Sequence, residues 1–277
     1  MKSKIQGLIH NENSIQIREI EVSIISKCHL QCDNCGFYIP QQPQPSLTDD
    51  IIYEISQGLL QLQRLNIRIG SLAILGGEPS YNKTLLNKAL NEFSKFKNID
   101  RIELVSHGLT PQNIEKNLLK HINKLTISVY FESAKLIELW KQYITLFASH
   151  IDLEFRIDKD WDKWVSEETA NDTKGQKMFD FCWYRKHCIT LERKRLFVCS
   201  RIPKLSQDQE GLILNKQTTI LDVEKYLNQT KFLPSCKTCT PMMGGETVKA
   251  GQQPDDRILK MIPKAINYLK KEIDYEL

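Results

Sequence analysis

Several features that would place this chain in a broad class of protein are missing from its sequence. No apolar run approaches the ~18 residues that a membrane span needs, and the first residues, "MKSKIQGLIHNENSIQ", lack the apolar core of a secretory signal. The net charge of +4 is small for 277 residues, so composition gives no reason to expect binding to nucleic acid or to a membrane. We find no internal repeat and no glycine-rich phosphate loop. These absences predict a cytoplasmic enzyme.

What the sequence does contain is eight cysteines in two sets. Thiols stay reduced in the cytoplasm, so metal binding is a better prediction than disulfides. The first set is Cys28-x3-Cys32-x2-Cys35, directly behind an apolar stretch. The long region that follows has no cysteine, which predicts two separate sites. The second set comprises Cys182, Cys188, Cys199, Cys236 and Cys239.

The region between the two cysteine sets alternates between strand and helix patterns. Helical spacing of apolar residues predicts helices at 46–65, 85–93, 111–122 and 134–147. Apolar and β-branched runs predict five strands, at 20–26, 71–75, 101–106, 124–131 and 151–158. This alternation predicts an α/β fold with a parallel sheet, which right-handed crossovers would curl into a full or partial (β/α) barrel.

Each unusual group of residues follows one of the predicted strands. The first cysteines follow the first strand, Gly76-Gly77-Glu78-Pro79 follows the second, and Ser106-His107-Gly108 follows the third. Barrels of this kind carry their chemistry at the C-terminal ends of the strands. We therefore expect these groups to meet at one edge of the sheet.

The cysteine loop and the glycine segment together resemble a known family. Three thiolates without a fourth nearby ligand suit an iron–sulfur cluster with one open iron, since a structural zinc site needs four ligands. The first set resembles the CxxxCxxC loop of radical S-adenosylmethionine (SAM) enzymes, and Gly76-Gly77-Glu78-Pro79 resembles their GGEP segment. The resemblance covers roughly residues 18 to 160. A zinc site or incidental thiols are the alternative.

The resemblance implies a [4Fe-4S] cluster on the first three cysteines, with SAM on its fourth iron. One electron would cleave SAM to a 5′-deoxyadenosyl radical, which abstracts hydrogen from substrate. The family often has an aromatic residue where this chain has Asn34, so Phe37 or Tyr38 is expected at the adenine instead. Other expected SAM contacts are Gly76, Gly77 and Pro79 at the glycine segment, Glu78 at the amino group, Ser106 and Ser128 at the ribose, and Arg156 at the carboxylate. A serine in a strand is more often a satisfied core polar group, which is the alternative for both serines.

The C-terminal cysteines resemble the "twitch" extension of these enzymes, a shortened SPASM domain that holds an auxiliary iron–sulfur cluster. "CITLERKRLFVC" predicts a β-hairpin, although the turn Glu192-Arg193-Lys194-Arg195 lacks the glycine usual there, and 220–227 predicts a short helix. One four-iron cluster needs at most four of the five cysteines. Cys199, Cys236 and Cys239 are the expected ligands, while Cys182 and Cys188 compete for the fourth place. The spare thiol would be a hydrogen donor or inert, and tetrahedral zinc is the alternative.

These interpretations divide the chain into a partial barrel (1–160), a connector (161–181), a small hairpin-and-helix cluster domain (182–245) and an amphipathic helix (246–277) interrupted before Pro263. The resemblance implies an oxidoreductase-type enzyme that removes hydrogen from a small polar metabolite, such as a sugar or aminocyclitol alcohol. Its electron donor would be a flavodoxin or ferredoxin. A peptide-modifying maturase, a radical epimerase and a non-enzymatic zinc-stabilised binding module are the alternatives.

Basic residues crowd the predicted hairpin. Such a run is either a solvated face or an anion site for a substrate phosphate or an acidic electron donor. The residues are Arg185, Lys186, His187, Arg193, Lys194, Arg195, Arg201 and Lys204.

Overall fold

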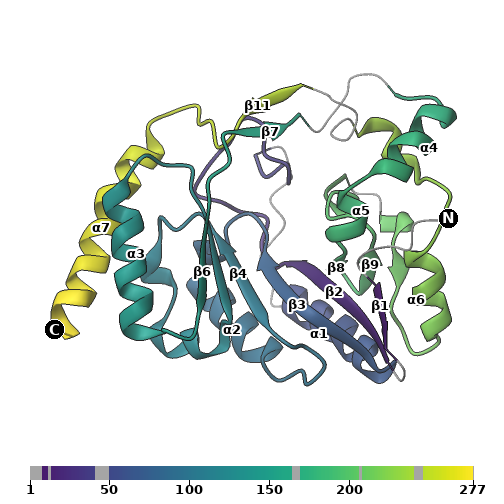
Figure 1. The fold of residues 1–277 in the computed structure, drawn as a ribbon, viewed down its shortest axis with the longest axis horizontal. Helices are drawn as coiled ribbons and strands as arrows, with labels where there is room; N and C mark the ends of the chain where they lie inside the picture. The colour runs from purple at the N-terminus through teal and green to yellow at the C-terminus, as the bar shows by residue number, and fades with distance from the viewer. Residues whose placement is uncertain are drawn as a thin grey trace.

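The centre of the protein is a nine-stranded sheet (Figure 1). The computed structural model describes residues 8–11, 14–40, 50–163, 169–205, 208–239 and 246–276. Five strands are parallel neighbours in chain order, which confirms the predicted parallel sheet. The sheet does not close on itself among these residues, so the fold is a partial barrel. The five strands are β2 (Ser14–Ser23), β3 (Ile67–Leu75), β4 (Ile102–Ser106), β5 (Lys124–Ser128) and β6 (Asp152–Arg156).

Three α-helices form the crossovers between these strands. They are α1 (Asp50–Arg64), α2 (Lys83–Phe93) and α3 (Ala134–Phe147). Each buries the apolar stripe that predicted it, as α1 does with Ile55, Leu59 and Leu62. The expected start of the first helix, at 46–49, lies outside the described residues. None of the described helices is long and apolar enough to cross a membrane.

The prediction of a helix over 111–122 is wrong. The segment forms two 3-10 turns, Pro111–Asn113 and Lys116–His121, separated at Glu115, whose backbone is extended. In this conformation Ile114, Leu118 and Leu119 are buried in the core. Packing onto the core therefore overrides the helical pattern of the sequence.

The predicted interruption before Pro263 is also wrong. The last helix, α7 (Arg257–Glu276), runs continuously through this proline and packs beside α3 (Figure 1). Proline removes one helical hydrogen bond, to the carbonyl of Leu259. Leu259 is exposed, so water can satisfy that carbonyl. Burial of Ala265, Leu269 and Ile273 holds the helix together beyond the proline.

The predicted cluster domain extends the same sheet with three short strands. The predicted hairpin forms as β8 (Thr190–Glu192) and β9 (Arg195–Phe197), with β10 (Leu212–Ile213) beside β9. β8 pairs in parallel with β2, and β1 (Leu8–Asn11) pairs with β2 as a hairpin. The helices of this part are α4 (Asp172–Phe181), α5 (Tyr184–His187) and the predicted α6 (Ile220–Leu227).

The hairpin turn contains no glycine, and two basic residues adopt the left-handed backbone conformation there. Arg193 has φ +48° and Lys194 has φ +59°, a conformation that residues with a Cβ rarely adopt. The Arg193 guanidinium donates to the carbonyl of Pro203 at 3.2 Å. The Leu214 N–H donates to the carbonyl of Lys194 at 2.8 Å. These contacts stabilise the turn.

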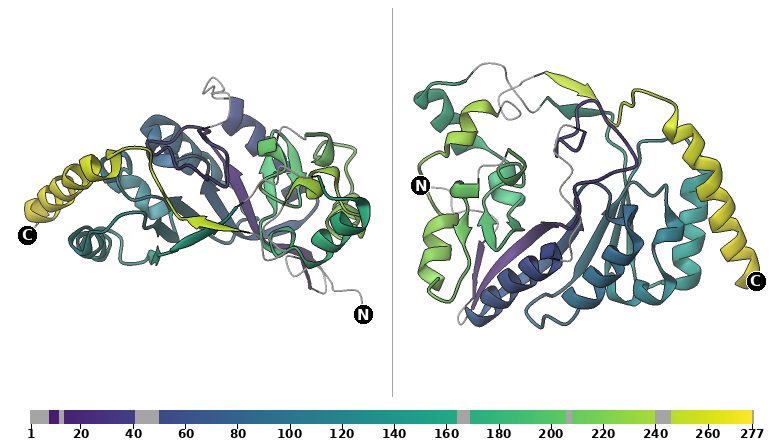
Figure 2. Two further views of the ribbon diagram at one scale, coloured as in Figure 1. Left: turned by 90° about the horizontal axis from the view of Figure 1, so that it is seen from above. Right: turned by 180° about the vertical axis from the view of Figure 1, so that it is seen from behind.

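A segment near the C-terminus crosses the open end of the sheet. β7 (Asp160–Asp162) pairs with β11 (Thr247–Lys249), and both lie above the strand ends (Figures 1 and 2). Residues 252–257, which we call the strap, then contact the first cysteine loop. Hydrogen bonds join them, among them Asp33 N–H to the Gln252 carbonyl (3.0 Å), Gln31 N–H to Gln253 Oε1 (2.8 Å) and the Arg257 guanidinium to the His29 carbonyl (3.1 Å).

Candidate active site

The predicted groups do meet at one edge of the sheet. A cavity of about 390 Å³ lies at the carboxyl ends of β2 to β6, within the size range of small-ligand pockets. Parallel strands end at the same edge, so the loops that follow them share this space. The predicted site residues that line it are Cys28, Cys32, Cys35, Phe37, Gly76, Gly77, Glu78, Ser106, Ser128 and Arg156.

Two predicted SAM contacts lie outside this lining. Pro79 opens the 3-10 turn Pro79–Tyr81 and is buried. Tyr38 follows the cysteine loop with φ +53°, and its hydroxyl accepts a hydrogen bond from Arg201 in the C-terminal part of the chain. Of the two aromatic candidates for adenine, Phe37 is therefore the one that lines the cavity.

The thiols of the first cysteine loop are largely buried. Burial raises the pKa of Cys32 to about 11, and it also raises the pKa values of Cys28 and Cys35 above the ordinary value. The thiols alone are therefore protonated at neutral pH, and a bound metal must displace their protons. Two donors already point at the sulfurs: the Gln253 amide at 2.9 Å from Cys32 Sγ, and the Leu30 N–H at 3.3 Å from Cys28 Sγ.

The glycine segment anchors the chain that leads into this loop. Gly77 N–H donates to the Ile25 carbonyl at 2.7 Å, and Glu78 N–H donates to the Lys27 carbonyl at 2.8 Å. A Cβ on Gly77 would lie 2.1 Å from the Lys27 oxygen, and one on Gly76 (φ +150°) would lie 2.3 Å from the Ile25 oxygen. The missing Cβ atoms thus admit the backbone at 25–27, next to Cys28. Glycine is needed here for packing between two loops.

Glu78 is the centre of a buried hydrogen-bond network. Glu78 is 1% exposed. Its carboxylate accepts four hydrogen bonds, from Ser80 N–H (3.0 Å), Ser80 Oγ (2.5 Å), Ser106 Oγ (2.8 Å) and His107 N–H (2.8 Å). Burial alone would raise the pKa of this carboxyl. The charge interaction with His107 and the hydrogen-bond donors lower it by more than burial raises it. The pKa of Glu78 therefore lies below its ordinary value. Ser106 also accepts from Gly108 N–H at 3.1 Å, so it is satisfied within the protein.

This network gives a pH-dependent stability prediction. Glu78→Gln should destabilise the protein by about 1–3 kcal/mol at pH 7, because an amide nitrogen would face donors. A depressed folded-state pKa contributes stability above the ordinary carboxyl pKa, and this contribution is lost as pH falls through the folded value. The difference between wild type and variant should therefore shrink on acidification. Urea unfolding of the metal-free protein at pH 7 and near pH 4 would measure it.

The control for this prediction is Glu92→Gln, which changes an exposed carboxylate paired with Lys95 at 2.6 Å. Exposed pairs contribute ~0–1 kcal/mol. Equal and pH-independent losses for the two variants would contradict the special role of Glu78.

The three cysteines of the first loop line one wall of the cavity, and three thiols are a donor set that an iron–sulfur cluster can take. Among the described residues, no three His, Cys, Asp or Glu side chains converge closely enough to hold one metal ion. Cys32 is buried, and Cys28 and Cys35 are partly exposed at the cavity wall, so all three can reach a group bound there.

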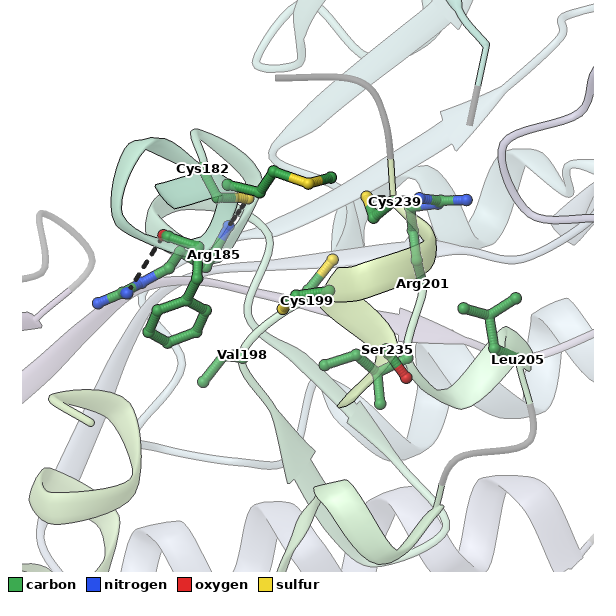
Figure 3. A pocket seen from close by; sticks show the side chains of 12 residues that line it. Cys182, Arg185, Val198, Cys199, Arg201, Leu205, Ser235 and Cys239 are labelled. Carbon is green, nitrogen blue, oxygen red and sulfur yellow. Dashed lines mark hydrogen bonds between the residues drawn. The ribbon is translucent and has the colours of Figure 1, made fainter. Parts of the chain in front are cut away.

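A second pocket lies in the C-terminal part of the chain (Figure 3). Four of the five cysteines line it. Cys182 follows α4, Cys199 follows β9, Cys236 lies in the 3-10 turn Pro234–Thr238, and Cys239 ends that turn. Cys188 does not line this pocket. The residue is 9% exposed, and its thiol lies beside the Glu21 carboxyl group on β2.

Two of the basic residues around the hairpin turn inward to this pocket. The Arg185 guanidinium lies 3.8 Å from the centre of the Phe179 ring and donates to the Phe179 carbonyl at 3.3 Å. Arg201 donates to Cys239 Sγ at 2.8 Å (Figure 3). The prediction of a solvated face is therefore wrong for these two buried residues. The Lys186 side chain lies outside the part of the chain that the structure describes.

Sequence reasoning missed the charged inner end of the cavity. Glu19, Glu21, Glu103 and Lys124 project from β2, β4 and β5 into it. Burial, with the neighbouring Glu19, raises the pKa of Glu21 to about 7. Lys124 Nζ lies 3.4 Å from the Glu103 carboxylate and 2.6 Å from that of Glu154. The signal was present in "REIEVS", where acidic residues alternate with buried apolar ones along β2.

Three further aromatic residues stand at the cavity wall: Tyr130, Trp161 and Tyr184. Trp161 comes from β7 and meets Tyr130 edge-on at 5.2 Å between ring centres. The Tyr184 hydroxyl donates to Asp162 at 2.9 Å. The predicted connector and the C-terminal part therefore help to enclose the cavity.

Comparison with known proteins gives distant structural likenesses. No protein-family model matches the chain. No curated protein matches it either. A crystal structure of BtrN in complex with AdoMet and 2-DOIA is 13% identical, with a TM-score of 0.48 over 85% of this chain and 96% of that one. Native anSMEcpe with bound AdoMet is 11% identical, with a TM-score of 0.46 over 92% of this chain and 99% of that one.

A third likeness is coproporphyrinogen III oxidase (HemN) from Escherichia coli, described as a radical SAM enzyme. It is 13% identical, with a TM-score of 0.34 over 92% of this chain and 52% of that one. TM-scores below 0.5 at such identities are too distant to establish a shared family, so the functional argument rests on the residues of this chain.

Proposed function

We propose that this chain is a radical SAM enzyme that removes hydrogen from a small polar metabolite. One observation carries the proposal: the three cysteines of the first loop and the Gly76-Gly77-Glu78 segment line one cavity at the carboxyl edge of a parallel sheet. The two motifs are about fifty residues apart in the sequence, and the glycine segment is hydrogen-bonded to Ile25 and Lys27, directly before the cysteine loop. An incidental set of thiols has no reason to be paired with such a segment.

In this proposal each residue of the cavity edge has a defined task. Cys28, Cys32 and Cys35 would hold a [4Fe-4S] cluster, which with SAM supplies the electron and the hydrogen-abstracting chemistry. Gly76 and Gly77 fix the chain entering the loop. The acceptor capacity of Glu78 is used within the protein, so its task is to hold the Ser80 and His107 segments in place. The strap supports the loop from the opposite side through Gln253.

Two residues are positioned to bind the polar parts of SAM. Ser128 and Arg156 are register partners at the ends of β5 and β6, and both line the cavity. Arg156 would pair with the carboxylate of SAM, because its planar guanidinium can bind both oxygens. Phe37 would contact the adenine. Tyr130 and Trp161 help to exclude water from the space between.

The inner end of the cavity favours a hydroxylated or amine-bearing substrate. Glu19, Glu21 and Glu103 offer acceptors, and Lys124 offers a donor. Lys124 and Glu103 pair with each other, so it is the polar and charged lining of this end, and no unpaired group, that favours such a substrate. A sugar or aminocyclitol alcohol fits this chemistry, with oxidation to a ketone as the reaction. The C-terminal cysteines would then hold the group that accepts the substrate's second electron.

A radical epimerase is the second candidate, and a specific observation favours it. The Cys188 thiol lies beside Glu21, and Glu21 lines the cavity. A thiol is therefore present one residue behind the cavity wall. A hydrogen returned from this thiol would come from solvent. The two reactions separate in heavy water: an epimerase incorporates deuterium into its product, and a dehydrogenase does not.

The first test is SAM cleavage by anaerobically reconstituted protein under reduction with dithionite. The proposal expects 5′-deoxyadenosine and methionine to form. Their formation should be faster in the presence of substrate and absent without reductant. Protein that contains zinc and no sulfide, and that leaves SAM intact, would overturn the proposal in favour of a zinc-stabilised binding module.

A further inference from the structure

A single buried arginine connects the two cysteine sites. Arg201 is 4% exposed, and one arm of its guanidinium donates to Cys239 Sγ at 2.8 Å. The other arm donates to the Tyr38 hydroxyl, and the guanidinium carbon lies 5.2 Å from the centre of the Tyr38 ring. Tyr38 stands three residues after Cys35, so the Arg201 side chain joins the first cysteine loop to the C-terminal pocket.

The loop after Cys35 is held in a specific conformation for this contact. Tyr38 has φ +53°, a left-handed conformation that is unfavourable for a residue with a large side chain. Its N–H donates to the Cys35 carbonyl at 2.9 Å, which closes the turn. One residue earlier, the Phe37 ring lies 5.6 Å from Lys204 Nζ. Two neighbouring aromatic residues of the loop thus contact two basic residues of the same C-terminal turn.

The C-terminal pocket has the charge balance of an anion site. Its lining contains four thiols and two guanidinium groups, and no carboxylate is among the lining residues. The Arg201 guanidinium is buried against Cys239 Sγ in this lining. A buried cation of this kind is stabilised when the neighbouring sulfurs are anionic, as they are when bound to metal.

The same cation affects the redox properties of an iron–sulfur group. Reduction adds one electron and no proton, so the reduced group carries one more negative charge. A guanidinium that donates to a ligand sulfur stabilises the reduced form more than the oxidised form. The reduction potential is therefore higher with Arg201 present than without it.

We propose that Arg201 is a positioning residue that couples the two cysteine sites. It fixes the Cys35–Tyr38 turn against the C-terminal pocket, and it raises the reduction potential of the iron–sulfur group that Cys182, Cys199, Cys236 and Cys239 hold. This inference rests on the proposed function, and specifically on the presence of that second group.

The experiment uses the full chain with Cys28, Cys32 and Cys35 changed to Ala, so that only the C-terminal group gives a signal. A titration with dithionite, followed by electron paramagnetic resonance, measures its potential. Arg201→Gln is expected to lower the equilibrium constant for reduction on the order of tenfold, which is about 59 mV for a one-electron couple. Arg201→Lys, which keeps the charge, should retain most of the potential.

The matched control is Arg195→Gln in β9, a few residues before Arg201, where the guanidinium donates to the Gly211 carbonyl outside the pocket. Its potential should equal that of the parent. Hydrogen exchange of the reconstituted two-site protein tests the positioning role separately. Arg201→Gln and Tyr38→Phe should both speed exchange at the Tyr38 amide, and Arg195→Gln should not.

An unchanged potential in Arg201→Gln with full iron content would overturn the inference. So would a parent protein whose C-terminal cysteines bind zinc or no metal, while SAM cleavage by the first site would still stand in that case. If Arg201→Gln fails to retain iron, Tyr38→Phe decides. Faster exchange at the turn supports the coupling, and unchanged exchange overturns it.

Discussion

Alanine at Cys28, Cys32 and Cys35 together is expected to remove about four iron atoms per chain and all SAM cleavage. These thiols line the cavity edge, and no other cysteine lies in that lining. The C-terminal pocket has its own four thiols, so about four of roughly eight irons should remain if each site holds a [4Fe-4S] cluster. Iron and sulfide assays on anaerobically reconstituted protein, with 5′-deoxyadenosine as the activity readout, measure both effects.

The matched control for this triple variant is Cys188→Ala. Cys188 belongs to neither set of pocket-lining cysteines, and its thiol lies beside Glu21. Its removal should therefore leave the iron content unchanged. If the triple variant keeps all of its iron, the first loop is not a cluster site. If it loses everything, the C-terminal cysteines hold no cluster of their own.

Gly77→Ala is expected to disrupt the site almost as severely. The new Cβ would meet the Lys27 carbonyl oxygen at 2.1 Å, and this contact is with backbone, which cannot turn aside. The two segments must move apart, which weakens or breaks two hydrogen bonds. These run from Gly77 N–H to the Ile25 carbonyl and from Glu78 N–H to the Lys27 carbonyl. Overpacking of this kind costs about 1–3 kcal/mol. Because Lys27 precedes Cys28, iron incorporation should fall as well.

Gly175→Ala is the control for this substitution. Gly175 lies within α4, where a Cβ would meet only side-chain atoms of Phe232 and Lys237, at 3.3 Å. Alanine gains about 1 kcal/mol of helix propensity there, which offsets the tight contacts. Urea unfolding and iron content compare the two variants. Equal stability of Gly77→Ala and wild type would contradict the role assigned to the glycine segment.

The parallel sheet and its crossovers were predictable because their signals are local. The β-branched runs and the apolar stripe of α1 depend on the period of the backbone, which is the same in any fold. The errors have tertiary causes. Packing of Ile114, Leu118 and Leu119 replaced a helix with 3-10 turns, and the packing of α7 carried a helix through Pro263.

Part of the candidate site could not have been inferred from sequence. The strap reaches the first cysteine loop from more than two hundred residues away, and Gln253 and Arg257 carry no motif. Glu78 was predicted to accept from SAM, but its carboxylate already receives four protein donors. Whether a polar group is free for a ligand depends on its neighbours in space. Its position in a motif does not determine this.

The sequence by itself determined the chemistry of the donors: which residues are thiols, how three of them are spaced, and that they follow a strand. It left Cys182 and Cys188 as equal candidates beside Cys199, Cys236 and Cys239. Only the tertiary structure separated them. Pairing of β8 with β2 places Thr190 opposite Glu21, which brings Cys188 to the Glu21 carboxylate, while the end of α4 brings Cys182 to the pocket of the other three. The spacing of cysteines along a chain does not encode which strands will pair, and that pairing decides which thiols share a space.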